Sequence, residues 1–567
     1  MSGSDRSFTE NDGVAVEKFK PSRRFMAAFS SLAVVNLACA LDATDIGIAL
    51  PVITGDIGGN AVQALWIGTS FLLASTVWQP LFVAVSDVFG RRPLLILALI
   101  LFTAGSIMSG VAKNPTLMLA GRSVQGSGVG GVLTLTEAII TDLVPLRERG
   151  NFIALISIVW AVGTVAGPLV GGALAQNNDW RWIFYLNLPI LGIGFVGVVL
   201  FLNQDLRQRG LLEKLRKIDY LGSFLFVSSL TSMLIALSWG GTMYAWSSWH
   251  TLVPLILGAA GLAAFTVHQV VLGSESRPAG KRLDTLLPMR IFANRSTSIT
   301  YMNTFLHGMI LWSLVYYMPL YFQSAKSYNP IQTGLTALPQ TLTVVPCAMV
   351  VGVVSSKTGH YRWSLYIGFA ITTLGMGLLY LLDVGTTIVE WVFLLLIGGV
   401  GIGLLFPGMN LSIQASVPNK DIAISAGLFT FFRAAGQSVG VAVGEAIFQN
   451  RLDKILSPYP DLQMTSLDAI SIIPEISSLP PVQSDILKHA YADAIKVIWA
   501  TMCGLSGVAL VATFFVKEYT LDQMLAGEQG FVDSGKNKST GASETLSNGE
   551  AEKAVMGSDM AQARTSQ

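Results

Sequence analysis

The sequence predicts an all-α, polytopic membrane protein with fourteen transmembrane helices, arranged as two six-helix bundles and two linking helices. Composition gives the first reason, because 52% of the residues are hydrophobic and only 13% are charged. Soluble domains carry roughly a quarter charged residues, so this supply could not cover a water-facing surface. The other reasons are that the charges cluster between long apolar runs, and that these runs have the length of a membrane span.

A helix needs about 20 mostly apolar residues to cross a bilayer. Fourteen stretches qualify, near residues 25–47, 62–84, 92–112, 115–140, 151–175, 182–202, 218–238, 248–272, 297–322, 332–355, 361–382, 387–416, 422–447 and 495–516. The first residues of the chain are polar, so we expect the first apolar run to be a span rather than a cleaved signal peptide.

The distribution of Lys and Arg predicts the side of the membrane on which each loop lies. Most of the 36 Lys and Arg residues share a side with the N-terminus, and the positive-inside rule makes this side cytoplasmic. The predicted division is a disordered cytoplasmic tail (1–22), an N-terminal bundle (23–205), two linking helices (206–272), a cytoplasmic loop (273–296), a C-terminal bundle (297–517) with an extracellular loop (448–494), and a disordered cytoplasmic tail (518–567).

No residue pattern in the sequence predicts a metal site, a catalytic nucleophile or a nucleotide-binding site. The cysteines Cys39, Cys347 and Cys503 all fall within apolar runs, which predicts buried thiols and no disulfide framework. The net charge of +1 gives no indication of a nucleic-acid partner. We therefore expect no cofactor, no metal, no catalytic site and no nucleic acid, which argues against a membrane enzyme and against an ATP-driven pump.

Glycines four residues apart recur in two spans at corresponding positions of the two bundles. These are Gly163, Gly167 and Gly171 in the fifth span, and Gly436, Gly440 and Gly444 in the thirteenth. Such spacing places the glycines along one helix face, where another backbone can approach closely. Repeated halves that rock about a central site are typical of secondary transporters. Simple helix packing without a role in transport is the alternative interpretation.

Four sequence motifs occur in order along the first five spans. They are residues 41–44 (LDAT) with 49–51 (ALP), residues 86–93 (SDVFGRRP), residues 122–126 (RSVQG) and residues 163–172 (GTVAGPLVGG). Together they resemble the major facilitator superfamily, and specifically its fourteen-helix drug:proton antiporter branch, which is common in fungi. The resemblance covers roughly residues 25–517.

The resemblance implies roles for three groups of residues. It implies an export signature of Gly163, Gly167, Pro168, Gly171 and Gly172, a cytoplasmic gate of Asp87, Gly90, Arg91, Arg92 and Asp142, and a motif of Arg122, Gln125 and Gly126 in the fourth span. In the gate, the charges would latch the inner end while the transporter faces outward. Alternatively, the arginines of the gate only set the orientation of the chain.

Ionisable side chains at membrane depth need a partner or a function. Asp42 and Arg122 lie near the outer ends of the first and fourth spans, so we expect them at similar depth. We hypothesise that they pair across a central cavity and that Asp42 carries the coupling proton, with Asp45 as a possible second carboxylate. A static ion pair near the water interface is the alternative for Asp42, and a solvated helix end is the alternative for Asp45.

The resemblance implies that the first, fourth, ninth and twelfth spans line the substrate cavity. The candidate lining residues are His307, Trp312, Tyr316, Tyr317, Asn410 and Gln414. Aromatic walls with a few amides suit apolar, variably functionalised molecules. For each of these residues, helix packing or an interfacial aromatic belt remains an alternative role.

Together these observations predict a secondary transporter that exports hydrophobic small molecules, such as drugs, toxins or secondary metabolites, in exchange for protons. We expect a monomer in the lipid bilayer of the plasma membrane, with a vacuolar or vesicle membrane as the alternative. An importer of siderophore-bound iron, sugar or another nutrient on the same fold remains the rival function. A receptor that does not transport is a further alternative.

Overall fold

The computed structural model describes residues 21–59, 61–177, 179–202, 215–241, 243–273, 285–459 and 472–521. Over these residues the chain is helical and contains no strand, with one isolated bridge between Gly240 and Tyr244. The predicted tails lie almost entirely outside the described residues, as do most of the predicted cytoplasmic loop and the start of the linking region.

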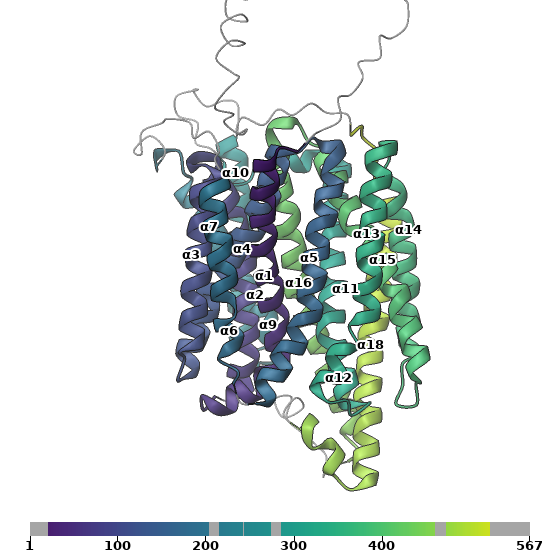
Figure 1. Cartoon of the computed structure of the whole chain (residues 1–567). Coiled ribbons are helices and arrows are strands. Elements are labelled where there is room, and N and C mark those ends of the chain that lie inside the picture. Colours follow the sequence, from purple (N-terminus) through teal and green to yellow (C-terminus); the bar gives the residue numbers. More distant parts are fainter. Residues whose placement is uncertain are drawn as a thin grey trace, which may run out of the picture.

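The N-terminal half forms one bundle, coloured purple to blue in Figure 1. Its helices are α1 (Arg23–Asp56), α2 (Ala61–Phe89), α3 (Arg91–Gly110), α4 (Pro115–Leu143), α5 (Leu146–Gln176), the short α6 (Trp182–Tyr185) and α7 (Asn187–Phe201). Within the bundle, α4 packs against α2 and α3, and α5 packs against α1. We call the end that carries Arg23 and Leu143 the inner end, after the predicted orientation.

The C-terminal half forms a second bundle beside the first, coloured green to yellow in Figure 1. Its elements are α11 (Arg295–Ser324), α12 (Pro330–Leu335), α13 (Leu338–Thr358), α14 (Arg362–Leu378), η3 (Leu379–Leu381), α15 (Ile388–Ala415), η4 (Asn419–Asp421), α16 (Ile422–Leu456), η6 (Ile473–Ser478) and α18 (Pro481–Thr513). The bundles meet where α13 packs against α5 and where α16 packs against α2 and α4.

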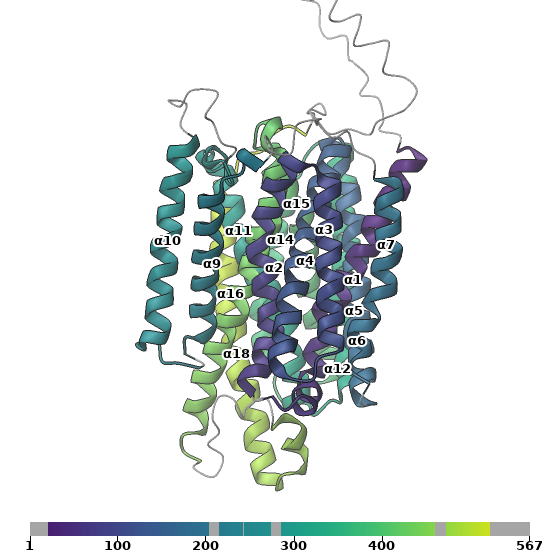
Figure 2. The ribbon, with the colours of Figure 1, turned by 90° about the vertical axis from the view of Figure 1, so that its left-hand side faces the viewer.

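The linking helices form a hairpin outside the two bundles. Helix α9 (Tyr220–Trp239) packs against α10 (Trp249–Gly273) and also contacts α2 and α16, one helix from each bundle. Figure 2 shows α10 as the outermost helix on this side. The short 3-10 helix η2 (Met289–Ala293) then leads into α11.

Local sequence signals explain where several helices begin. The Ser22 side chain caps α1 by accepting a hydrogen bond from the Phe25 N–H at 3.1 Å. Asn114 caps α4 in the same way, with Pro115 at the first helical position. Between α2 and α3, Gly90 has a φ of 99°, a conformation that a residue with a side chain rarely adopts.

Twelve helices are long and apolar enough to cross a membrane, which confirms a multi-pass architecture over the described residues. Helices α4 and α16 are not among the twelve, although they have 29 and 35 residues and pack within the bundles. Both carry ionisable side chains and several glycines, which lower their mean hydropathy. The total of fourteen spans therefore remains a prediction.

The predicted extracellular loop 448–494 is helical at both of its ends, and its extracellular position remains a prediction. Helix α16 continues to Leu456 and α18 already begins at Pro481, so both helices extend beyond the apolar stretches that defined their ends. The extensions contain polar residues that are compatible with a helix, and a loss of apolar character does not interrupt backbone hydrogen bonding. Proline at the first position of α18 suits a helix start. The outer part of α18 projects beyond the other helices in Figure 1.

Candidate functional site

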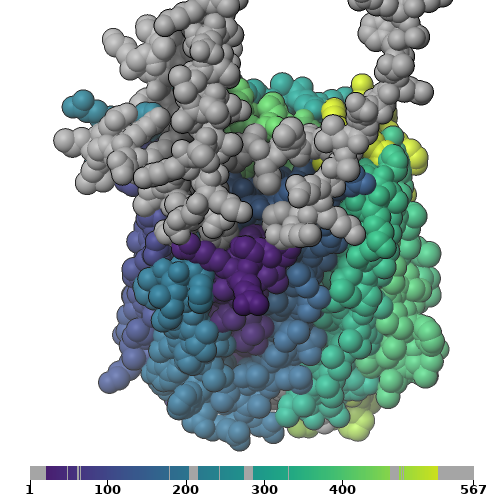
Figure 3. Space-filling model, turned by 45° about the horizontal axis from the view of Figure 1, so that its top comes forward, coloured from purple at the N-terminus to yellow at the C-terminus, as the bar shows by residue number. Residues whose placement is uncertain are grey.

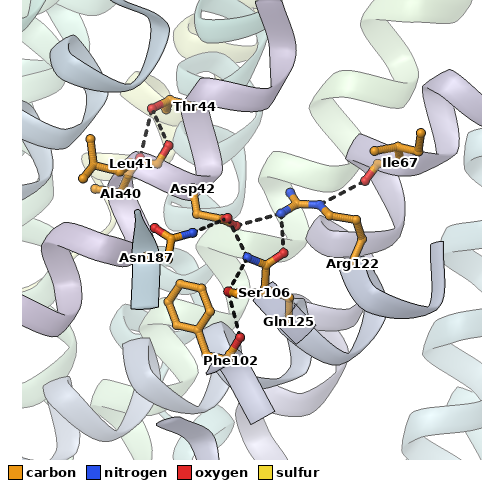
Figure 4. A network of polar contacts seen from close by, with 10 residues as sticks. All are labelled: Ala40, Leu41, Asp42, Thr44, Ile67, Phe102, Ser106, Arg122, Gln125 and Asn187. Carbon is orange, nitrogen blue, oxygen red and sulfur yellow. Dashed lines mark hydrogen bonds and ion pairs between the residues drawn. The ribbon is translucent and has the colours of Figure 1, made fainter. Parts of the chain in front are cut away.

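A buried ion pair joins α1 to α4 in the N-terminal bundle. The Arg122 guanidinium donates to the Asp42 carboxylate at 2.8 Å, and both side chains are at least 98% buried. Arg122 also donates to the Ile67 carbonyl at 3.3 Å, and its guanidinium lies 4.1 Å from the centre of the Phe71 ring. Figure 4 shows this pair at the centre of a polar network. The predicted partnership of Asp42 with Arg122 is thus present in the structure.

Amide side chains complete the coordination of the Asp42 carboxylate. Gln125 donates to it at 2.6 Å and accepts a hydrogen bond from Arg122 at 2.7 Å. Asn187 of α7 donates to the same carboxylate at 2.8 Å, and Ser106 of α3 accepts from Gln125 at 3.0 Å. Helices α1, α4 and α7 therefore meet at Asp42, and α3 joins the network through Gln125. The charge of Asp42 is compensated by an ion pair and two amide donors.

The ion pair does not cross the central cavity, which corrects the geometry that the sequence predicted. Both partners belong to the N-terminal bundle, and Asp42 is fully buried between α1, α4 and α7. The neighbouring residues Ala43 and Thr44 line the cavity, and so does Arg122. A helix turns by about 100° per residue, so Asp42 faces the bundle interior while its neighbours face the cavity. Any effect of Asp42 on the cavity must pass through Arg122 or through a movement of α1.

The export signature brings α5 into close contact with α1 beside Asp45. A side chain at Gly163 would overlap Ala40, one at Gly167 would lie 3.1 Å from the Leu41 carbonyl oxygen, and one at Gly171 would overlap the Asp45 backbone. Pro168 lines the cavity, and Gly172 is buried in α5. Asp45 itself is buried and not solvated, and its Oδ1 has no hydrogen-bond partner.

A cavity of about 730 Å³ lies between the two bundles. Its wall includes residues near the outer ends of several elements, among them Thr54, Gln323 and Ile473. Towards the inner end it extends only to the level of Glu137 and Arg433. The lining is mostly apolar, so the cavity suits an apolar ligand that enters or leaves at the outer end.

The structure places four of the six predicted cavity residues in the wall: His307, Trp312, Tyr316 and Tyr317. The indole N–H of Trp312 is buried without a hydrogen-bond partner. Asn410 and Gln414 do not line the cavity, because they lie closer to the inner end, where the bundles are in contact. Their amides hydrogen-bond across that contact instead.

Three charged residues that the sequence analysis did not include among the site residues line the cavity: Glu137, Arg433 and Glu445. Glu445 accepts hydrogen bonds from Gln449 at 2.6 Å and from Tyr317 at 3.4 Å. The Arg433 guanidinium lies 4.7 Å from the centre of the Phe406 ring. Charge within an apolar span was the signal available in the sequence, but it does not indicate which way a side chain points.

The inner end is closed by direct contacts between the bundles. Arg147 of α5 donates to the Ser356 carbonyl of α13 at 2.8 Å. Nearby, a side chain at Gly150 would lie only 3.1 Å from the Gly352 Cα, so the backbones of α5 and α13 almost touch. Further towards the middle of the bundles, the Thr134 hydroxyl of α4 and the Thr430 hydroxyl of α16 are 3.2 Å apart. Figure 3, seen obliquely from the inner end, shows the blue and green halves packed against each other where grey atoms do not cover them.

The predicted gate residues form a charge cluster at the inner ends of α2, α3 and α4. Arg91 forms an ion pair with Asp87 and a second one with Asp142 at 3.0 Å. It also donates to the Ser86 hydroxyl at 2.5 Å. Arg92 donates to the Val199 carbonyl of α7 at 2.7 Å. These contacts join helices of the N-terminal bundle, and a latching role for them remains a prediction.

The site and fold can now be compared with known proteins. A family model described as Major Facilitator Superfamily matches residues 32–441. The chain therefore belongs to the major facilitator superfamily, a family of membrane transporters, and it is a multi-pass membrane protein.

Relatives match almost the whole chain. The protein called MFS transporter L2 of Phoma sp. is 46% identical over 92% of this chain and 87% of its own length. The MFS-type efflux pump LUC4 of a Fusarium species is 38% identical over 92% and 93%, respectively. The MFS-type efflux pump MMF1 of Pseudozyma antarctica is 34% identical over 95% and 99%.

Solved structures show the same fold at low sequence identity. The human organic anion transporter MFSD10 has a TM-score of 0.56 at 15% identity, covering 87% of this chain and 100% of that protein. An inward-facing bacterial homologue of the lysosomal transporter Spinster has a TM-score of 0.55 at 16% identity, covering 88% and 98%.

Proposed function

We propose that this chain is a fourteen-helix exporter of hydrophobic small molecules that works by alternating access and is driven by protons. The observation that carries the proposal is a mostly apolar cavity between the bundles that reaches the outer end while the inner end is closed. This is the arrangement expected of a transporter caught while facing outward. Relatives whose names describe efflux pumps support export as the direction.

The proposed substrate class follows from the cavity wall. Aromatic side chains such as Trp312, Tyr316 and Phe406 offer large apolar surfaces, and the free indole N–H offers one hydrogen bond to a polar substituent. A drug, toxin or secondary metabolite with an apolar body fits this description. Import of a nutrient on the same fold is the rival function, and the transport direction distinguishes the two. We propose that the protein acts as a monomer in the plasma membrane.

Proton coupling is proposed to act through the ion pair of Asp42 and Arg122. Protonation of Asp42 would remove the charge that holds Arg122, which also lines the cavity. A released guanidinium at the wall would change the charge that the substrate meets, and α1 would be free to shift against α4. Protonation of Asp42 inside the bundle would thereby change how the cavity wall interacts with the substrate.

The test is uptake of fluorescent hydrophobic dyes into inside-out membrane vesicles with an acidic lumen, for which we expect Asp42→Asn to reduce gradient-driven uptake at least about tenfold. The amide keeps the shape of the side chain and its acceptor oxygen but cannot exchange a proton. Asp56→Asn is the matched control, because Asp56 lies at the exposed outer end of the same helix. Wild-type uptake by a correctly inserted Asp42→Asn variant would contradict the role of Asp42.

A further inference from the structure

A series of hydrogen-bonded, buried side chains connects the two bundles at two points, on the inner side of the cavity. Glu137 of α4 accepts a hydrogen bond from Asn410 of α15 at 3.2 Å. Gln414, one turn further along α15, donates to Asn410 and accepts from Arg149 of α5 at 2.8 Å. The series thus runs from the N-terminal bundle into the C-terminal bundle and back. We call these four residues the floor network.

The floor network is shielded from water except at one end. Glu137 is 6% exposed and lines the cavity, whereas Asn410 and Gln414 are fully buried and Arg149 is 4% exposed. Arg149 is held further by donating to the Val144 carbonyl at 2.7 Å and to the Thr141 carbonyl at 2.6 Å. A proton that enters the cavity from the outer end can therefore reach Glu137.

Two arginines carry positive charge in the surroundings of Glu137. Arg433 on α16 lines the same cavity, and Arg149 on α5 lies at the other end of the floor network. Helix α15 contributes the Asn410 amide, which donates to the Glu137 carboxylate. Helix α11 contributes His307, which lines the cavity together with Glu137. Among the described residues, no cation lies within ion-pair distance of this carboxylate. Its protonation state thus depends on the cavity and on a hydrogen bond, in contrast to Asp42, which is enclosed by its partners.

We propose that Glu137 is a second proton-accepting group, and that its ionised form keeps the inner end closed through the floor network. The inference rests on the proposed proton-driven transport and adds a residue and a mechanism to it. A hydrogen bond to a charged acceptor is stronger than one to a neutral acceptor. Protonation from the outer side therefore weakens the contact between Glu137 and Asn410.

The direction of proton movement agrees with export. The proton reaches Glu137 through the outward-facing cavity, the inner contacts loosen, and the bundles open at the inner end. There the proton leaves to the cytoplasm. Glu137 is then ionised again, and the floor network closes the inner end. One proton moves inward per cycle at this site, while the substrate moves outward.

Two readouts test the proposal on the full chain. The first is dye uptake into acidic inside-out vesicles, compared with dye-for-dye exchange without a gradient. For Glu137→Gln we expect gradient-driven uptake to fall about tenfold while exchange stays within about twofold, because the amide still accepts from Asn410 but binds no proton. Glu390→Gln is the control, since Glu390 is an exposed residue in the capping box of α15 and glutamine can serve the same cap.

The second readout is the separation of the inner ends, measured by electron spin resonance between labels at the exposed residues Arg23 and Lys420. In the parent protein we expect this distance to lengthen when the medium is acidified from neutral pH, because protonation weakens the closed state. In Glu137→Gln the pH dependence should disappear, and in Asn410→Ala the long distance should be populated already at neutral pH.

The outcomes separate this inference from the proposed function. If the parent protein shows no gradient-driven uptake, the proposed function fails. If it does, and Glu137→Gln keeps both gradient-driven uptake and a pH-dependent inner distance, then Glu137 is not a proton site and the inference is overturned. Loss of gradient-driven uptake and exchange together, at normal membrane insertion, would show a purely structural residue and would also overturn it.

Discussion

The Asp42 carboxylate shows how a charge is accommodated at membrane depth. An isolated carboxylate at the centre of a span costs about 2.5–3.5 kcal/mol on insertion scales. Here Arg122 supplies a counter-charge, while Gln125 and Asn187 supply hydrogen bonds. The sequence predicted the pairing with Arg122 because both residues lie near the outer ends of antiparallel spans. It did not predict Asn187, because sequence does not give the rotation of the sixth span about its axis.

Glycine contacts between α1 and α5 give a prediction at the same scale. In Gly171→Ala, the new methyl group would overlap the Asp45 backbone, so α5 must move away from α1. We expect the free energy of unfolding to fall by about 1–3 kcal/mol, as for other overpacked contacts. The readout is the thermal unfolding midpoint of the purified protein in detergent.

The matched control for this substitution is Gly192→Ala on α7. No atom lies within 4 Å of the Cβ position of Gly192, so alanine fits without strain. Alanine also favours a helix over glycine by about 1 kcal/mol, so the control should unfold at the same or a higher temperature. If Gly171→Ala unfolds like this control, the contact between α1 and α5 is looser than the structure indicates.

At the scale of elements, hydropathy located the spans but not all the ends of the helices. Each of the fourteen apolar stretches corresponds to a helix or a helix pair in the structure. The ends differ most around the outer loop, where α16 and α18 extend into polar sequence. A helix ends when its backbone hydrogen bonds end, and apolar character ends at the membrane surface, so the two boundaries need not coincide.

The loop between η3 and α15 gives a prediction that depends on pH. Partial burial would raise the pKa of Asp383, but the Val384 N–H, Lys496 and His489 outweigh it and lower the pKa below its ordinary value of 3.8. The N–H donates at 2.8 Å, and Lys496 lies at 3.5 Å. A lowered pKa in the folded state stabilises the protein above the unfolded value, and this stabilisation is lost as the pH falls through the folded value.

We therefore expect Asp383→Asn to destabilise the protein near neutral pH, and the difference to vanish only below the lowered pKa of the parent carboxyl, towards about pH 2. The side chain is half-exposed, so the difference should be only about 0.2–1 kcal/mol. Unfolding midpoints of the two proteins across this pH range provide the measurement. A difference that persists unchanged in acid would show that the charge of Asp383 is not responsible.

At the scale of the whole molecule, the two-bundle architecture was predictable and the conformation was not. Composition and span spacing predicted an all-helical, multi-pass chain, and the described residues confirm it. The helix contacts group these residues into two bundles and an outer hairpin, while the exact domain boundaries and the similarity of the two halves stay predictions. The state of the cavity depends on small differences between contacts at its two ends, such as the approach of Gly150 to Gly352. The resemblance placed Asn410 and Gln414 in the cavity wall, whereas in this conformation they lie in the closed inner contact.

The central claim is that the whole molecule exports hydrophobic molecules at the expense of inward proton movement. The most direct measurement reconstitutes the purified protein into liposomes with an acidic lumen and follows a panel of neutral and cationic hydrophobic dyes, with protein-free liposomes as the control. Molecules whose outer end faces the lumen should accumulate dye inside, and collapse of the gradient should stop the accumulation. Gradient-driven loss of preloaded dye from the lumen, as a proton-coupled importer would produce, or no protein-dependent dye movement at all, would contradict the account.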